Sequence, residues 1–564
     1  MTNKDISKIL QRTASLMELH GENTFKVRSY TGTAFQLEKL DVRLSEITPD
    51  ERKEQGISAG MTSKIAEIIE TGTYSELEKL AEKTPKGVVE MLELKGIGAK
   101  KIRVIWQELG IETLTNLKQA CQEGEVAALK GFGDKTQKLI IDQIDFKKAN
   151  VGRLHFAKAA PYAVKLVDFI KENISGVKVE IAGQVRRNLE IVDTVSLVVS
   201  TANTTGLKSV LSELEEIEYL EKKSSPYVWR GVVRENALQI EVHITNATEF
   251  ASELFLQTSA AAHLKISVGE EGKTLRTLAL ENTYPSEEKI YEQIGWAYVP
   301  PELREGTFEA KAAIENTIPK LIEEQDLKGV LHNHSTYSDG KHTLREMAEH
   351  CKELGYEYLG ITDHSQTAFY ANGLKEDRIR QQHEEIDLLN EALAPFKIFK
   401  GIESDILTDG SLDYPDYVLA SFDFIVSSIH GNLKMTEEKA MMRLLKAIEN
   451  PYTTILGHMT GRLLLRRDGY PVNHEKIIKA CAKHGVAIEI NANPWRLDID
   501  WRWVQPALQA GVMLSINPDA HEKAGYQDMR YGLLTGRKGG LTAAQNLNSL
   551  SQDEIDAYFK SRKK

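Results

Sequence analysis

Cysteine is scarce in this chain of 564 residues, and no apolar run is long enough to cross a bilayer. Only Cys121, Cys351 and Cys481 are present, and they lie far apart. This spacing excludes a disulfide framework and a Cys-x-x-Cys metal site. The N-terminal stretch MTNKDISKIL has no signal-peptide core. We therefore expect a cytoplasmic protein with no membrane partner.

Positive charge is also in deficit, because 71 Lys and Arg residues face 82 Asp and Glu residues, for a net charge of −11. This balance argues against a protein that coats nucleic acid indiscriminately, but it allows a local basic surface. The composition, 41% hydrophobic and 27% charged, is that of a globular chain. The length predicts about three or four domains. Eleven of the 15 histidines follow position 329, so we expect the site chemistry in the C-terminal part.

From residue 326 onward the sequence repeats one unit, a short β-rich run that ends in polar residues and is followed by a helical stretch. Strands that alternate with helices imply a parallel sheet, and seven such units predict a (β/α)7-type barrel. In such barrels the C-terminal strand ends carry the chemistry. The seven runs are GVLHNH, YLGITDH, FKIFKGIES, FDFIVSSIHG, TTILGHMTG, VAIEINANP and VMLSINPDAH.

Potential metal ligands gather at these strand ends. The stretch GVLHNHSTYSDGKHT puts His332 and His334 on alternate positions, which point the same way in a strand. One His-x-His pair is weak evidence, but nine His, Asp and Glu side chains on one rim favour a functional site over ordinary buried or capping residues. The nine candidate ligands are His332, His334, Asp339, His364, Glu403, His430, His458, Asp519 and His521.

The chemistry of these side chains indicates a phosphoesterase. Imidazole and carboxylate suit Zn²⁺, Mn²⁺ or Fe. Nine ligands are too many for one tetrahedral ion, so two or three ions that share a bridging carboxylate fit better. Such clusters activate water and clamp the attacking and leaving oxygens of a phosphate ester. The same rim offers Arg462, Arg466, Arg467 and Arg496, and we expect Arg462 and Arg496 to contact phosphate.

These motifs resemble those of the PHP (polymerase and histidinol phosphatase) phosphoesterase family. The resemblance spans roughly residues 326–564 and lies at LHNHSTYSDG, ITDHS, GIESDI with SSIHG, and GHMTGR with NPDAH. It implies a distorted seven-unit barrel with three divalent metal ions, bridged by Glu403 as a catalytic residue. It further implies one ion on His332, His334, Glu403 and Asp519, a second on Glu403, His430 and His458, and a third on Asp339, His364 and His521.

Two similar sequences recur in the N-terminal part, LKGIGAKK at 94–101 and LKGFGDKT at 129–136. Their glycines allow positive φ and bring backbone N–H groups close to an anion at a helix N-terminus, as in a helix-hairpin-helix that holds a DNA phosphate without reading bases. A plain helical hairpin can give one such string, but the repeat favours DNA contact. Residues 95–150 carry ten Lys and Arg against seven Asp and Glu, or +3 (10 − 7). We expect binding to DNA ends or gaps without sequence specificity through Gly96, Gly98, Lys100, Gly131, Gly133 and Lys135.

The front half resembles bacterial family X DNA polymerases that carry a C-terminal PHP domain. The stretches ISKILQRTASLMELHGENTFKVRSYTGTA, GQVRRNLEIVDTVSLVV and SEEKIYEQIGWAYVPPELREG look like their N-terminal helical domain, the palm entry and the segment ahead of the PHP domain. The resemblance implies a multidomain α/β chain. Its expected parts are a helical DNA-binding domain at 1–90, a helix-hairpin-helix, fingers-like region at 91–150, a nucleotidyltransferase-like palm at 151–245, a thumb-like region at 246–320 and the PHP domain at 321–564.

The expected palm departs from the family pattern at the positions that matter for polymerisation. The family places an Asp-x-Asp pair on one palm strand and a third Asp on a neighbouring strand, to hold two Mg²⁺ ions. Here the pair aligns with Thr194 and Ser196, and the third position aligns with Glu241. Asp193 is near, but the residue two further on is Val195, so neither register supplies a pair. We expect a degenerate palm without polymerase activity that serves as a structural or DNA-holding scaffold.

The leading hypothesis is a monomeric, DNA-binding, metal-dependent phosphoesterase that acts as a 3′→5′ exonuclease or cleans 3′ ends in DNA repair. A second hypothesis is a small-molecule phosphomonoesterase of the histidinol phosphatase kind, for which the DNA-binding half would be unnecessary. A third is a non-enzymatic DNA-binding scaffold whose metals only stabilise the fold. The complete ligand set argues against this third hypothesis, because structural sites rarely need so many ligands.

Overall fold

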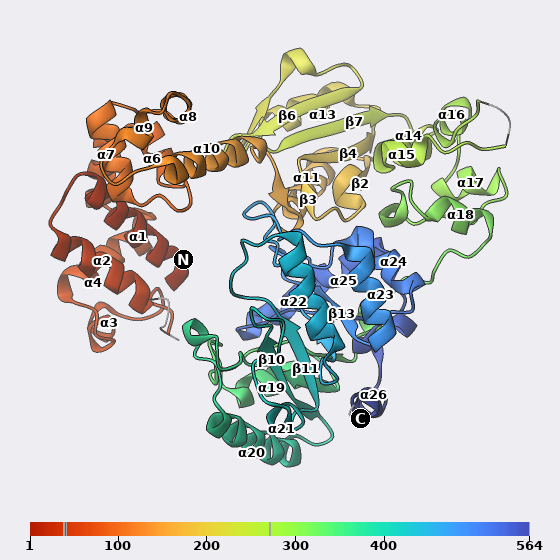
Figure 1. Cartoon of the computed structure of the whole chain (residues 1–564). Coiled ribbons are helices and arrows are strands. Elements are labelled where there is room, and N and C mark those ends of the chain that lie inside the picture. Colours follow the sequence, from red (N-terminus) through yellow and green to blue (C-terminus); the bar gives the residue numbers. More distant parts are fainter. Residues whose placement is uncertain (38–39, 41, 270–271, 563–564) are drawn as a thin grey trace. The chain divides into compact units, whose positions relative to one another are not determined.

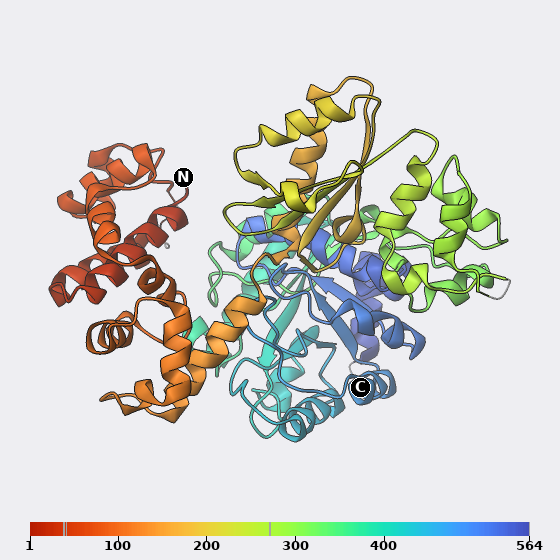
Figure 2. The same cartoon turned by 90° about the horizontal axis from the view of Figure 1, so that it is seen from above.

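The computed structural model describes residues 1–37, 40, 42–269 and 272–562, and the chain forms two compact units, Met1–Val151 and Gly152–Lys564. No described helix combines the length and the apolar character that a bilayer crossing requires. Within the described residues the first unit consists of helices, shown in red to orange in Figures 1 and 2. They are α1 (Asn3–Leu19), α2 (Thr24–Leu37), α3 (Pro49–Glu54), α4 (Ala59–Thr71), α5 (Ser75–Lys83), α6 (Lys86–Met91), α7 (Ala99–Leu109), α8 (Leu114–Glu123), α9 (Glu125–Ala128) and α10 (Asp134–Ala149).

Apolar faces of these helices form one core. Leu10 and Met17 of α1 pack with Ile65 of α4 and with Ile102 and Ile105 of α7, and all five are at most 1% exposed. Their spacing of three or four residues, or multiples of these, is the period of an amphipathic helix. The hydrophobic contacts between helices, rather than intrinsic propensity, therefore hold these short helices together.

The second unit begins with a five-stranded sheet in the order β2-β4-β7-β6-β5. The central strands β4 and β7 are parallel, and the other pairs are antiparallel. Alternate residues of β4 face opposite sides, so Leu197 packs under α11 and α13 while Val198 packs against Phe250 of α14. The elements are β1 (Leu154–His155), α11 (Phe156–Asn173), β2 (Lys178–Ala182), α12 (Gly183–Arg186), β3 (Ile191–Val192), β4 (Thr194–Ser200), α13 (Thr204–Ser212), β5 (Ile217–Tyr219), β6 (Val228–Val233) and β7 (Gln239–Thr245).

A helical segment follows the sheet and has its own small core. At its centre the fully buried Arg304 guanidinium lies 2.5 Å from the Glu287 carboxylate. A buried charge of this kind is tolerated only when it is paired. The helices are α14 (Phe250–Thr258), α15 (Ala261–Leu264), α16 (Leu275–Glu281), α17 (Glu287–Glu292) and α18 (Glu309–Ile314).

The C-terminal part is a parallel seven-stranded sheet in the order β14-β13-β12-β11-β10-β9-β8, with helices α19 to α25 around it (Figure 1). The two edges approach each other beyond the strand ends, where Asn333 and Ala520 form a parallel bridge that nearly closes the barrel. The strands are β8 (Gly329–Val330), β9 (Tyr358–Ile361), β10 (Lys397–Asp405), β11 (Phe424–Ser428), β12 (Ile455–Leu456), β13 (Ala487–Asn491) and β14 (Leu514–Asn517). The helices are α19 (Leu344–Glu353), α20 (Glu376–Leu393), α21 (Asp416–Leu419), α22 (Glu437–Glu449), α23 (His474–His484), α24 (Val504–Gln509), α25 (Met529–Lys538) and α26 (Gln552–Arg562).

The predicted fold class is confirmed in its helical N-terminal region, its mixed α/β middle and its barrel of seven parallel strands. The barrel strands are buried along most of their length. This is the reason that they appear in the sequence as nearly continuous apolar runs rather than as alternating patterns.

Candidate metal centre and nucleic-acid interface

The candidate ligands come from the C-terminal ends of six barrel strands, as the spacing predicts. The chain leaves β8 in an extended segment, where the His334 N–H donates to the Ala520 carbonyl at 2.8 Å. This bond connects the segments that follow β8 and β14. The ring centroids of His332 and His334 lie 5.3 Å apart. The other ligands lie in β10 (Glu403) or beyond β8 (Asp339), β9 (His364), β11 (His430), β12 (His458) and β14 (Asp519 and His521).

Glu403 lies at the centre of the cluster and is 1% exposed. Five imidazoles surround its carboxylate within 3.7 Å, as expected for a group that bridges ions. Its Oε1 lies 3.0 Å from His458 Nε2, 3.1 Å from His430 Nε2 and 3.4 Å from His332 Nε2, and its Oε2 lies 2.9 Å from His364 Nδ1 and 3.7 Å from His334 Nε2.

The remaining two carboxylates extend the cluster toward the rim. Asp519 Oδ1 lies 3.1 Å from His334 Nε2. Asp339 Oδ1 lies 3.3 Å from His521 Nε2 and 3.7 Å from His364 Nε2. Three groups of residues each have ligand atoms that all lie within 4.8 Å of one another. His458 adjoins these groups through its Nε2, which lies 3.0 Å from Glu403 Oε1. The groups are His334, Asp339, His364 and His521; His332, His334 and Asp519; and His364, Glu403 and His430.

The donor set fits divalent metal ions. Several buried ligand atoms have no hydrogen-bond partner among the described residues, namely His332 Nε2, His334 Nδ1, His364 Nδ1, Glu403 Oε2 and His458 Nδ1. Unsatisfied buried polar atoms cost free energy and are rare in folded proteins. Cations among these imidazole and carboxylate groups would satisfy ligand atoms that no protein group satisfies.

Electrostatics favours the charged carboxylate at the centre. Burial opposes ionisation of Glu403, but the nearby imidazoles of His430 and His332 outweigh it and hold the pKa of Glu403 well below its usual range. Burial together with His521 and His364 lowers the pKa of His334 to about 3, which keeps this imidazole neutral as a metal ligand must be.

Two carboxylates behind the ligands, the fully buried Glu489 and the partly exposed Asp405, are not among the predicted site residues. Glu489 Oε2 accepts a hydrogen bond from His332 Nδ1 at 2.6 Å, and Asp405 Oδ1 accepts one from His430 Nδ1 at 2.5 Å. Each bond fixes the tautomer that leaves Nε2 facing Glu403. For Glu489 the sequence does contain a signal, an acid inside an apolar strand. Fully buried acids are rare unless they are paired, so such an acid indicates a partner.

The structure separates the two arginines that were expected to contact phosphate. The Arg462 guanidinium pairs with Asp500 at 2.5 Å and donates to the backbone carbonyls of Arg496 and Leu497. Its donors are therefore committed to the loop that follows β13. Arg496 Nε lies 3.9 Å from Asp519 Oδ2, at the edge of the metal cluster, and Arg496 is the better placed of the two for a phosphate oxygen.

The aligned polymerase positions lie side by side in the five-stranded sheet. Ser196 of β4 is the register partner of Glu241 of β7, and Thr194 begins β4 two residues earlier. Glu241 accepts a hydrogen bond from Arg230 Nε at 2.6 Å. A hydrogen bond from His243 and the Arg230 charge hold the pKa of Glu241 at about 2. The one acid among the three positions is thus already paired with a cation of the protein.

The two recurrent Gly-x-Gly sequences adopt the same local structure. Gly96 and Gly131 have φ of 82° and 85°, in the left-handed region that favours glycine, and Gly98 and Gly133 are the N-caps of α7 and α10. Neither cap is satisfied by a side chain, so the first N–H groups of both helices are available to an anion. Two exposed lysines, Lys100 and Lys135, lie in the first turns of these helices.

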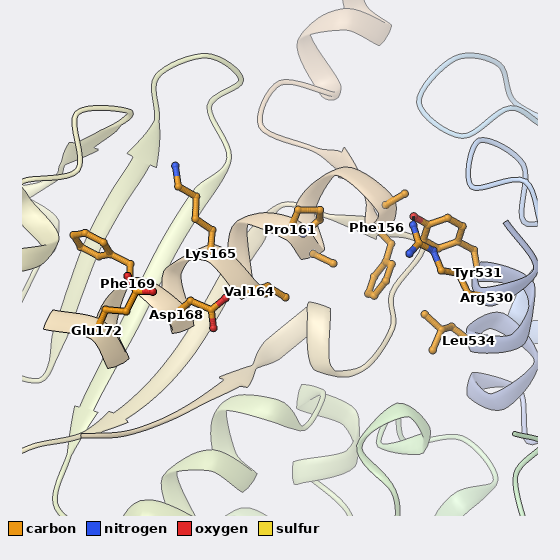
Figure 3. A pocket seen from close by; sticks show the side chains of 12 residues that line it. Phe156, Pro161, Val164, Lys165, Asp168, Phe169, Glu172, Arg530, Tyr531 and Leu534 are labelled. Carbon is orange, nitrogen blue, oxygen red and sulfur yellow. Dashed lines mark hydrogen bonds between the residues drawn. The ribbon is translucent and has the colours of Figure 1, made fainter. Parts of the chain in front are cut away.

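A pocket of about 760 Å³ lies away from the metal ligands, between α11 and α25. Figure 3 shows Phe156 of α11 beside Tyr531 of α25, with ring centroids 6.4 Å apart. Its lining is mostly apolar, and none of the nine candidate ligands belongs to it. This pocket therefore carries no part of the metal chemistry.

Comparisons with known proteins match three segments of the chain to known domains. Residues 1–74 match a helix-hairpin-helix domain, residues 88–145 a SAM-like helix-hairpin-helix tandem, and residues 331–493 a PHP domain. The fold and the site thus define a metal-dependent hydrolase of the PHP class that is joined to helix-hairpin-helix modules. The chain is 36% identical to the DNA polymerase/3′-5′ exonuclease PolX of Bacillus subtilis, over 99% of this chain and 100% of that protein. It belongs to the PolX family.

Other relatives match the C-terminal part. A probable phosphatase of Thermoanaerobacter sp. (strain X514) is 26% identical over 42% of this chain and 97% of its own length. A probable phosphatase of Caldanaerobacter subterraneus is 27% identical over 35% of this chain and 77% of its own length.

Proposed function

We propose that this protein hydrolyses phosphodiesters at DNA 3′ ends with its barrel, as a 3′→5′ exonuclease or 3′-end-processing enzyme in DNA repair. The observation that carries the proposal is the cluster of nine potential ligands, five of them imidazoles around Glu403, in a chain that also has two matching Gly-x-Gly turns. The full-length relative, named a DNA polymerase/3′-5′ exonuclease, supports the exonuclease part of the proposal.

Within this proposal the chain's own residues hold the site in place. His332, His334, Glu403 and Asp519 would hold one ion, Glu403, His430 and His458 a second, and Asp339, His364 and His521 a third. Bound Mn, Zn or Fe ions would supply activated water and neutralise charge that develops on the phosphate. Arg496 would orient a nonbridging phosphate oxygen. Glu489 and Asp405 would keep the ligand histidines in the required tautomer.

The hairpins and the five-stranded sheet would present the DNA. Uncapped N–H groups after Gly98 and Gly133, with Lys100 and Lys135 beside them, would hold backbone phosphates regardless of sequence. We propose that the chain divides into a helical DNA-binding domain at 1–90, a helix-hairpin-helix, fingers-like region at 91–150, a palm at 151–245, a thumb-like region at 246–320 and the PHP domain at 321–564.

The palm positions would have no polymerase activity. Thr194 and Ser196 carry no negative charge, and Glu241 is paired with Arg230. The neighbouring arginines are also committed, because Arg186 pairs with Glu287 and donates to Thr258 Oγ1 at 2.9 Å. Such a site has no free set of carboxylates for two Mg²⁺ ions.

The test of the proposal compares the wild-type protein with the Glu403→Ala variant on 5′-labelled single-stranded DNA in Mn²⁺. We expect stepwise shortening from the 3′ end by the wild type and none by the variant, while fluorescence anisotropy shows that both bind DNA alike. Cleavage that survives in Glu403→Ala would remove the barrel from the reaction. A matched control is Glu309→Gln, which alters another fully buried, His-paired carboxylate outside the barrel.

A second candidate is a phosphomonoesterase acting on a small substrate. The probable phosphatases that match the C-terminal part favour it, because almost the whole length of one of them corresponds to this part alone. Phosphate release from small monoesters, with DNA left intact under the same conditions, would favour this candidate over the nuclease.

A further inference from the structure

The loop that follows β9 and His364 exposes two adjacent aromatic side chains, one of which lies beside a candidate metal ligand. Phe369 and Tyr370 begin the 3-10 turn Phe369–Ala371 and are 82% and 73% exposed. The Tyr370 ring centroid lies 6.1 Å from that of the ligand His364. Adjacent exposed aromatic rings forgo the gain of burial, so their presence at a candidate active site points to a ligand that covers them.

Hydrogen bonds and buried neighbours hold the backbone that carries these two rings. The Thr367 N–H donates a hydrogen bond to Asp413 Oδ2 at 2.7 Å, and its single hydroxyl lies 2.9 Å from carboxylate oxygens of both Asp405 and Asp413. Ala368 and Ala371, which flank the two aromatic residues, are at most 1% exposed. Anchored ends and buried neighbours fix the backbone between them, so a ligand that met the rings would find them already in position.

The same anchor connects the rings to the metal centre. Asp405, whose Oδ2 lies 2.9 Å from Thr367 Oγ1, also accepts a hydrogen bond from the ligand His430. The Tyr370 ring centroid lies 6.1 Å from that of His364, so this exposed aromatic loop lies beside the candidate ligands.

We infer that Phe369 and Tyr370 form a stacking platform for the terminal bases of a single-stranded DNA 3′ end. Every base has a π face, so stacking binds a strand without reading its sequence, which suits a nuclease that shortens any end. The inference rests on the proposed function and adds to it the residues that would hold the terminal bases of the strand.

The main experiment is a cycle between protein and substrate, with the full-length chain in Mn²⁺. The wild type and the Phe369→Ala/Tyr370→Ala double variant each cleave 5′-labelled single-stranded DNA with natural or abasic residues at its last two positions. We expect kcat/KM of the wild type to fall by about fivefold to a hundredfold for each base that is lost. In the double variant the abasic substitution should change kcat/KM by less than twofold. If the two effects multiply instead, the rings do not contact the terminal bases and the inference is wrong.

Two further variants make the cycle specific. Tyr370→Phe keeps the ring and should cleave like the wild type, whereas a loss as large as that of Tyr370→Ala would assign the effect to the hydroxyl and contradict stacking. Tyr417→Ala removes a 68% exposed ring of α21, a residue assigned neither to the metal site nor to DNA holding, and should leave the base dependence unchanged. An equal effect of Tyr417→Ala would make the loss unspecific and would also overturn the inference.

A binding measurement separates failure of this inference from failure of the proposed function. It uses Glu403→Ala protein and an oligonucleotide with 2-aminopurine at its 3′ terminus, whose fluorescence is quenched by stacking. Quenching that disappears with the Phe369→Ala/Tyr370→Ala change supports the platform whether or not the wild type cleaves DNA. Quenching that persists unchanged contradicts the platform, even if Glu403→Ala has abolished cleavage as the proposed function requires.

Discussion

Replacing Glu489 by Gln should weaken metal binding while nearly preserving the shape of the site. The side chain is fully buried, and four N–H groups point at its two oxygens. Oε2 accepts from His332 Nδ1 at 2.6 Å and from Asn517 Nδ2 at 3.1 Å, and Oε1 accepts from the His458 backbone N–H and from Asn491 Nδ2, both at 3.1 Å. Both oxygens of this carboxylate therefore act only as acceptors.

An amide cannot replace this carboxylate in either orientation. If its NH2 faces His332, the imidazole must accept at Nδ1 and carry its proton on Nε2, the atom that faces Glu403. If it faces the other way, the His458 N–H and Asn491 are left without an acceptor, at about 1–3 kcal/mol per orphaned buried group. Loss of a carboxylate that orients a ligand lowers metal affinity by about 10–100-fold, or about 1.4–2.7 kcal/mol.

The assay is a Mn²⁺ titration of phosphodiesterase activity, paired with direct measurement of Mn²⁺ binding. The half-saturating Mn²⁺ concentration should rise at least about tenfold in Glu489→Gln. The matched control is Glu309→Gln, whose buried carboxylate accepts from His263 at 2.8 Å outside the barrel, and which should leave the Mn²⁺ titration unchanged. The reasoning is refuted if folded Glu489→Gln protein titrates within twofold of the wild type, or if both variants shift alike.

Three other perturbations have definite expected results. The Lys100→Gln/Lys135→Gln double variant should bind single-stranded DNA more weakly in anisotropy titrations. The slope of the logarithm of the association constant against the logarithm of the salt concentration should decrease in magnitude by about 1.4. An unchanged slope would exclude both lysines from phosphate contact. Arg304→Met should lower the free energy of unfolding by about 2 kcal/mol in urea titrations, because Glu287 would lose its fully buried partner and keep only Arg186; a loss below about 1 kcal/mol would contradict a contribution of the buried pair. Removal of metal by a chelator should lower the melting temperature but leave the circular dichroism spectrum of a folded protein, because ions that bind the native state stabilise it; an unchanged melting temperature would mean that no ion had been bound.

The barrel could be predicted from sequence because its strands are short apolar runs that end in ligand-type residues. The same regularity located Glu403 and the histidines around it, since parallel strands bring their C-terminal ends to one rim. The repeated turns at Gly96 and Gly131 were also recognisable, because both glycines need a positive φ.

Other features depend on contacts that a linear pattern does not contain. Glu489 looks like an isolated acid in a strand until the fold places it behind His332. Arg462 and Arg496 look equivalent until Asp500 is seen to hold the first of them. The exposure of Phe369 is likewise invisible in sequence, because an aromatic residue in a short apolar stretch more often belongs to the core.

The most direct test of the account asks whether one protein shortens DNA but cannot extend it. A 5′-labelled primer, single-stranded or in a gapped duplex, is incubated with the wild-type protein, Mn²⁺ or Mg²⁺, and all four dNTPs. The account predicts products shorter than the primer, absent with Glu403→Ala, and no longer product under any condition. Template-directed extension would contradict it, because Thr194 and Ser196 would then belong to a working polymerase site.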